Sequence, residues 1–123
     1  MSDKTTILCV DDDEDILLVM KTILENADYE CITANTAAEG WEAFEANSPD
    51  AVIVDMMMED IDSGSELAEK IKQSAPDKPL YVLSSIGDNI AERADSSEVN
   101  ADGILQKPVD GETMLKILSE RLS

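Results

Sequence analysis

Five short apolar runs alternate along the chain with longer stretches in which apolar residues recur every three or four positions. The runs cover residues 5–10, 29–34, 51–54, 80–83 and 103–105. Their apolar residues are nearly continuous rather than alternating with polar ones, which is typical of strands covered on both faces of a sheet. The pattern therefore predicts five buried strands.

The stretches between these runs have the spacing of amphipathic helices. The first offers an inward stripe made of Ile16, Val19, Met20, Ile23, Leu24 and Ala27. Two later helices each open with a Ser/Thr-x-x-Glu capping box, at Thr36 and at Ser63. The helix expected near residues 89–96 has only Ile90, Ala91 and Ala94 to bury, so we expect it to be held least firmly.

Strict alternation of strand and helix predicts a parallel sheet with right-handed crossovers and helices on both faces. This is a doubly wound five-stranded α/β fold. The 123 residues contain no internal repeat, low-complexity linker or break in composition. We therefore expect one domain over residues 1–123.

Charge narrows the range of partners. Apolar residues make up 43% of the chain, which suits a globular protein, but the formal net charge is −19. Such a charge excludes a nucleic-acid or anionic-membrane surface and favours divalent cations and basic protein surfaces. The chain has no signal-peptide pattern and no apolar run of membrane-spanning length, so we expect a cytoplasmic protein.

Two cysteines and the lack of histidine remove further classes of function. Cys9 and Cys31 lie in separate apolar runs, without the spacing of metal ligands. We expect reduced, buried thiols and no zinc site. Without histidine, the chain cannot form the usual His-based catalytic triads or carry a phosphohistidine.

Polar residues that could bind a ligand or take part in a reaction follow four of the five predicted strands. They are Asp11, Asp12, Asp55, Ser84, Ser85 and Lys107. In an open α/β sheet, ligands bind outside the carboxyl ends of the strands. We expect the carboxylates to form an oxygen-rich pocket for a hard cation, Mg²⁺, beside a hydroxyl and an ammonium group for an anion. The neighbouring Asp13, Glu14 and Asp15 are assigned to an acidic first helical turn instead.

The motifs ILCVDDDEDI, AVIVDMMM, LYVLSS and ILQKP resemble those of response-regulator receiver domains, in their order and near their spacing. This resemblance implies a flavodoxin-like strand order 2-1-3-4-5. It also implies a stand-alone receiver of two-component signalling, with no output domain. On the metal side, the resemblance makes Asp55 the phosphoacceptor and assigns Mg²⁺ to Asp12, Asp55 and the backbone carbonyl of Met57. Asp11 would act mostly through a water ligand.

On the phosphoryl side, the resemblance assigns the oxygens of the aspartyl phosphate to Ser84 and Lys107. Counting from Pro79 favours Ser84 as the hydroxyl, whereas the spacing to Lys107 favours Ser85, so both stay open. The family further implies a histidine kinase or phosphotransfer protein as donor. A downstream protein would bind the face formed by the fourth helix, the fifth strand and the last helix.

The chain departs from the usual family pattern at Glu59, Ile104 and Val109, which puts the aromatic signalling switch of many receivers in doubt. Two other functions are considered. A haloacid-dehalogenase-type, Mg²⁺-dependent phosphatase would need a second Asp two residues after the nucleophile, where this chain has Met57. A degenerate receiver used only for binding would lack the key residues. We therefore expect a phosphoacceptor module and not a turnover enzyme.

Overall fold

The computed structural model describes residues 5–55, 63–85, 103–107 and 110–122, apart from the side chains at 63–65, 84, 85, 104, 106, 107 and 122. The helix expected at 89–96 lies outside these ranges. The elements, in chain order, are β1 (Thr6–Val10), α1 (Glu14–Asn26), β2 (Glu30–Ala34), α2 (Ala37–Asn47), β3 (Ala51–Asp55), α3 (Ser63–Ser74), β4 (Leu80–Ser85), β5 (Gly103–Lys107) and α6 (Gly111–Leu122).

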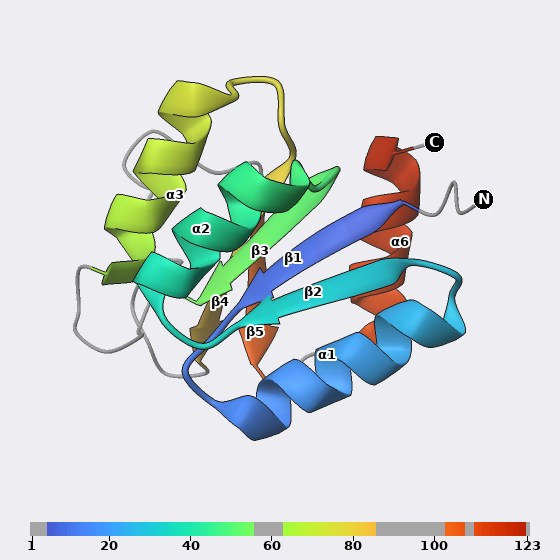
Figure 1. The fold of residues 1–123 in the computed structure, drawn as a ribbon. Coiled ribbons are helices and arrows are strands. Elements are labelled where there is room, and N and C mark those ends of the chain that lie inside the picture. The colour runs from blue at the N-terminus through green and yellow to red at the C-terminus, as the bar shows by residue number, and fades with distance from the viewer. Residues whose placement is uncertain (1–4, 56–62, 86–102, 108–109, 123) are drawn as a thin grey trace.

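The strands form one parallel sheet in the order β2-β1-β3-β4-β5. Helices α2 and α3 cover one face of this sheet, and α1 and α6 cover the other (Figure 1). The predicted α/β class, with a parallel sheet between two helical layers, is confirmed.

Successive strand residues enter two different hydrophobic clusters, because side chains alternate between the faces of a sheet. Leu8 and Val10 of β1 pack in the cluster under α2 and α3, whereas Ile7 and Cys9 pack in the cluster under α1 and α6. Both clusters are buried. This arrangement explains why the strands read as continuous apolar runs.

Helix α1 differs from the predicted apolar stripe at two positions, because Leu17, which the stripe left out, is buried and Val19 is not. Leu17, Met20 and Leu24 are its buried residues, whereas Val19 is 49% exposed. The prediction that Val19 faces the core is wrong. Val19 lies about 100° from Met20 and about 160° from Leu17 around the helix, so it projects away from the direction that the buried residues share.

Helix α2 lies unusually close to the sheet at Gly40. A Cβ atom at this position would lie 2.9 Å from Cγ2 of Val10 and 3.0 Å from Cδ2 of Leu67, so a larger residue would meet both β1 and α3. The helix starts as predicted, because the amide of Glu39 donates a hydrogen bond of 3.0 Å to Oγ1 of its cap, Thr36.

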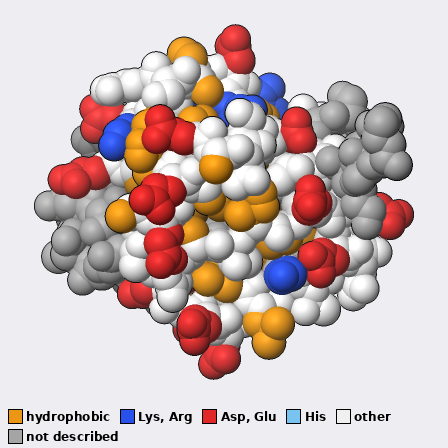
Figure 2. All heavy atoms as spheres, viewed as in Figure 1, with side chains coloured by type: hydrophobic (Ala, Val, Ile, Leu, Met, Phe, Trp, Pro, Cys, Tyr) orange, Lys and Arg blue, Asp and Glu red, His pale blue; other side chains and the backbone are white. Residues whose placement is uncertain are grey.

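Acidic side chains are spread over the surface. On the face seen in Figure 2, Asp and Glu side chains greatly outnumber those of Lys and Arg. Among the described helices, none combines the length and the apolar character needed to cross a membrane.

Candidate metal and phosphoacceptor site

The carboxyl ends of β1 and β3 bring three carboxylates together. These strands are direct neighbours, and Val10 pairs with Val54. The next residue on each strand, Asp11 or Asp55, therefore lies beside the other at the same edge of the sheet. Asp12 follows directly on β1. One carboxylate oxygen from each of Asp11, Asp12 and Asp55 lies within 4.8 Å of the other two.

The three carboxylates differ in their contact with solvent. Asp11 is 0% exposed and Asp55 is 2% exposed, whereas Asp12 is exposed. The site thus has two buried carboxylates and one at the solvent side. Like charges this close repel one another. A hard divalent cation with a preference for oxygen ligands would neutralise that repulsion, so the donor set fits Mg²⁺.

Asp13 links this cluster to helix α1. Its backbone N–H donates a hydrogen bond of 2.9 Å to Oδ1 of Asp11. Its own carboxylate caps α1 by accepting from the amides of Asp15, at 2.9 Å, and Ile16, at 3.4 Å. From the sequence, Asp13 is expected only as part of an acidic helix start, and its role as the cap is not predicted. The preference of Asp for N-cap positions was the available signal.

An acidic hollow adjoins the carboxylates. It has a volume of about 520 Å³ and is lined by Asp12, Asp13, Glu14, Asp15 and Asn35. Clefts lined by one sign of charge raise the local concentration of counter-ions. This hollow therefore gives a cation a favourable approach to Asp12.

The backbones of the other predicted residues reach the same edge of the sheet. Ser84 and Ser85 end β4, and Lys107 ends β5, with Ser85 paired to Lys107 in the register. The side chains of these three residues, and all of Met57, lie outside the described part of the chain. The choice between Ser84 and Ser85 therefore stays open.

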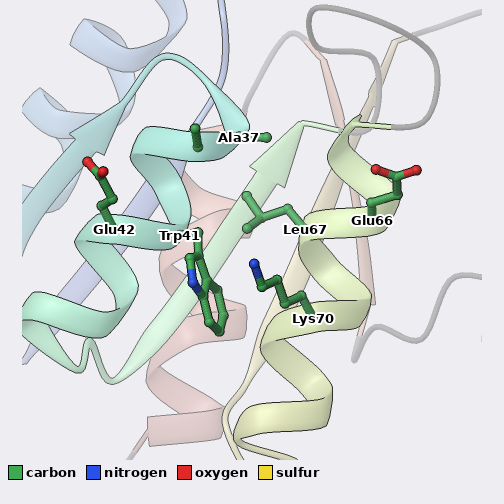
Figure 3. A pocket seen from close by; sticks show the side chains of 7 residues that line it. Ala37, Trp41, Glu42, Glu66, Leu67 and Lys70 are labelled. Atoms are coloured by element: carbon green, nitrogen blue, oxygen red, sulfur yellow. The ribbon is translucent and has the colours of Figure 1, made fainter.

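A second hollow, of about 370 Å³, lies between α2 and α3 (Figure 3). Trp41 and Lys70 meet there, with the ammonium nitrogen 4.3 Å from the centre of the ring. The two carboxylates of its lining, on Glu42 and Glu66, point away from each other (Figure 3). This hollow does not gather ligand atoms as the strand ends do, and we do not treat it as the functional site.

Comparison with known proteins identifies the family. The family model described as the response regulator receiver domain matches residues 7–119 of this chain. A probable transcriptional regulator, ycf27, from Cyanophora paradoxa is 34% identical over 105 residues, covering 85% of this chain and 43% of that protein. The response regulator MprA of Mycobacterium leprae is 32% identical over 109 residues, covering 89% of this chain and 47% of MprA. The chain thus spans less than half the length of these curated relatives.

Solved structures of similar fold also include members of this family. The chemotaxis protein CheY4 of Vibrio cholerae has a TM-score of 0.85 at 26% identity, covering 97% of this chain and 99% of CheY4. A CheY-like receiver domain protein from Methanospirillum hungatei JF-1 has a TM-score of 0.83 at 31% identity, covering 98% of this chain and 94% of that protein.

The fold and the matches together define a flavodoxin-like α/β signalling domain, and the chain belongs to the response regulator receiver family of two-component signalling. Receiver domains are signalling modules rather than classical enzymes. The matches do not favour the phosphatase or the degenerate receiver.

Proposed function

We propose that the chain receives a phosphoryl group on Asp55, with Mg²⁺ bound at the adjoining carboxylates, and passes the signal on through protein contacts. The observation that carries this proposal is the approach of Asp11, Asp12 and Asp55 to within 4.8 Å at one sheet edge, in a member of the receiver family.

In this proposal, some residues of the site bind the cation, and Asp55 also accepts the phosphoryl group. Asp12, Asp55 and the backbone carbonyl of Met57 would hold Mg²⁺, with Asp11 acting through a water molecule. When bound, the ion supplies positive charge that offsets the carboxylates and the incoming phosphoryl group. The Asp13 amide fixes one oxygen of Asp11, which keeps that buried carboxylate in position.

In the transfer itself, one carboxylate oxygen of Asp55 forms a bond to phosphorus as the bond from phosphorus to the donor breaks. A phosphohistidine donor leaves as free histidine, and acetyl phosphate leaves as acetate. Ser84 and Lys107 bind the phosphoryl oxygens in this proposal. Hydrolysis of the aspartyl phosphate returns the domain to its resting form.

The same proposal includes a phosphoryl donor, a cellular location and a downstream partner. The donor is a sensor histidine kinase or a phosphotransfer protein, and the receiver works in the cytoplasm. The downstream partner binds the face formed by residues 89–96, β5 and α6. We further propose that residues 1–123 form one receiver domain.

Labelling with acetyl phosphate tests the assignment. Intact mass spectrometry of the wild type should show the addition of one phosphoryl group, in the presence of Mg²⁺ only, and Asp55→Asn should show none. Asp77→Asn changes an exposed Asp in the turn before β4 and should be labelled like the wild type. Phosphorylation that persists in Asp55→Asn contradicts the proposal. Repeated hydrolysis of a phosphomonoester by the wild type would instead identify a phosphatase.

A further inference from the structure

The two cysteines form a thiol pair that the phosphoacceptor site does not use. Cys9 is on β1 and Cys31 on β2, and both belong to the cluster under α1 and α6. Their sulfur atoms lie 3.8 Å apart. Cys9 is 0% exposed, whereas Cys31, on the edge strand of the sheet, is 7% exposed. Both residues are therefore buried, Cys9 completely and Cys31 slightly less.

The register of the sheet determines what can join these sulfurs. Cys31 pairs with Ile7, and Cys9 pairs with Thr33, so the two cysteines are diagonal neighbours. An offset of two residues, about 6.6 Å, and a strand spacing of about 4.8 Å put their Cα atoms about 8 Å apart. A disulfide needs no more than about 7 Å unless the backbone moves. Direct oxidation to a disulfide is therefore opposed by the sheet.

A single atom bonded to both sulfurs fits the gap much better. Metal–thiolate bonds are about 2.3 Å long. Two such bonds span the observed 3.8 Å at a sulfur–metal–sulfur angle of about 110°, and a straight arrangement needs about 4.6 Å. The sulfurs would have to separate by less than about 1 Å for any angle in this range. Side-chain rotation alone can supply such a change.

The chemistry of the pair selects the kind of ion. Thiolates favour soft cations such as Cu(I), whereas Mg²⁺ prefers oxygen ligands. A structural zinc ion needs four ligands, and the whole chain has two cysteines and no histidine. We propose that Cys9 and Cys31 form a binding site for a soft cation of low coordination number, of the Cu(I) type, separate from the carboxylate site.

Binding at this site is an exchange of protons for metal. The two thiol protons pass to solvent, two sulfur–metal bonds form, and no atom changes its oxidation state. The contact with Cys9 lowers the pKa of Cys31, against the effects of burial and of Glu25, whereas the contact with Cys31 and complete burial raise the pKa of Cys9. The metal must therefore displace the Cys9 proton, and Cys31, the less buried residue of the pair, is the entry point.

Titration of the reduced protein with Cu(I) under argon, in competition with bicinchoninate, tests this site. The wild type should take one equivalent of Cu(I) and gain a thiolate-to-copper charge-transfer band in the ultraviolet. Cys31→Ala and the double variant Cys9→Ala/Cys31→Ala should lose both signals. The double variant keeps all six methionines and is therefore the matched control for thioether binding. Retention of the equivalent in either variant overturns the proposal, as does displacement of Cu(I) by excess Mg²⁺.

Alkylation of the wild type gives an independent measurement that does not depend on the folding of a variant. Cu(I) should protect Cys31 from iodoacetamide, as followed by mass spectrometry, and an unchanged rate of modification overturns the site. Treatment with diamide should give little internal disulfide while the protein stays folded. Rapid loss of two hydrogens in the native protein would show that a direct bond forms, against the bridging geometry.

Discussion

Neutralising Asp55 should stabilise the metal-free protein even though it removes the proposed phosphoacceptor. Asp55 and Asp11 are both buried, and their nearest carboxylate oxygens are no more than 4.8 Å apart. At an effective dielectric constant of about 20, two full charges at that distance repel by about 3.5 kcal/mol. Asp55→Asn removes this repulsion while keeping the shape of the side chain.

The gain is reduced by the hydrogen bonds that a carboxylate makes and an amide cannot replace. Hydrogen bonds to charged groups contribute about 1.5–3 kcal/mol each. Loss of one of them leaves a net stabilisation of about 0.5–2 kcal/mol. For a domain of this size, we expect a rise in Tm of about 2–8 °C.

Thermal and urea unfolding in EDTA provide the measurement. Asp77→Asn is the control, because it changes the formal net charge of −19 by the same single unit at an exposed position. A Tm for Asp55→Asn no higher than that of the control would refute the reasoning. In saturating Mg²⁺ the advantage of the variant should shrink, because the ion stabilises the folded wild type by mass action.

Three further substitutions probe separate parts of the structure. Asp12→Ala should remove most of the Mg²⁺-induced rise in Tm, and an undiminished rise in a differential scanning experiment contradicts its role as a ligand. Asp13→Ala should lower the free energy of unfolding by about 1 kcal/mol in urea unfolding, through loss of the α1 cap, whereas Asp13→Ser, which keeps a capping side chain, should stay near the wild type. Gly40→Ala should destabilise by about 1–3 kcal/mol in urea unfolding, because its new methyl group meets Val10 and Leu67, and a more stable variant would show that the helix yields easily.

Most of the architecture could be predicted because the central strands β1 and β3 are buried on both faces. An uninterrupted apolar run such as residues 51–54 predicts a strand whose side chains enter the hydrophobic clusters on both faces of the sheet. The charged Asp55 that follows marks the end of this strand. The error at Val19 arose where the pattern was ambiguous. Leu17, Leu18 and Val19 are consecutive apolar residues, and only contact with the sheet selects Leu17 as the buried one.

The chemistry of the site was predictable in kind but not in detail. Strand order alone brings Asp11 and Asp55 to one edge, since they end neighbouring strands. The hydrogen bond from the Asp13 amide depends on how the chain turns into α1, which composition does not determine. The thiol pair likewise needed the register of β1 and β2, because the sequence predicts only that both cysteines are buried.

The aromatic pair on α2 provides a fluorescence signal from one helical layer of the molecule. The only tryptophan, Trp41, stacks on the only phenylalanine, Phe44, with ring centres 5.6 Å apart, and Lys70 of α3 covers the indole. Its fluorescence therefore reports on the α2–α3 layer, while circular dichroism reports on all helices together. Coincident melting curves from the two signals would show that the sheet transmits unfolding between its layers as one cooperative unit. An earlier change in fluorescence would mean that the α2–α3 layer loosens first.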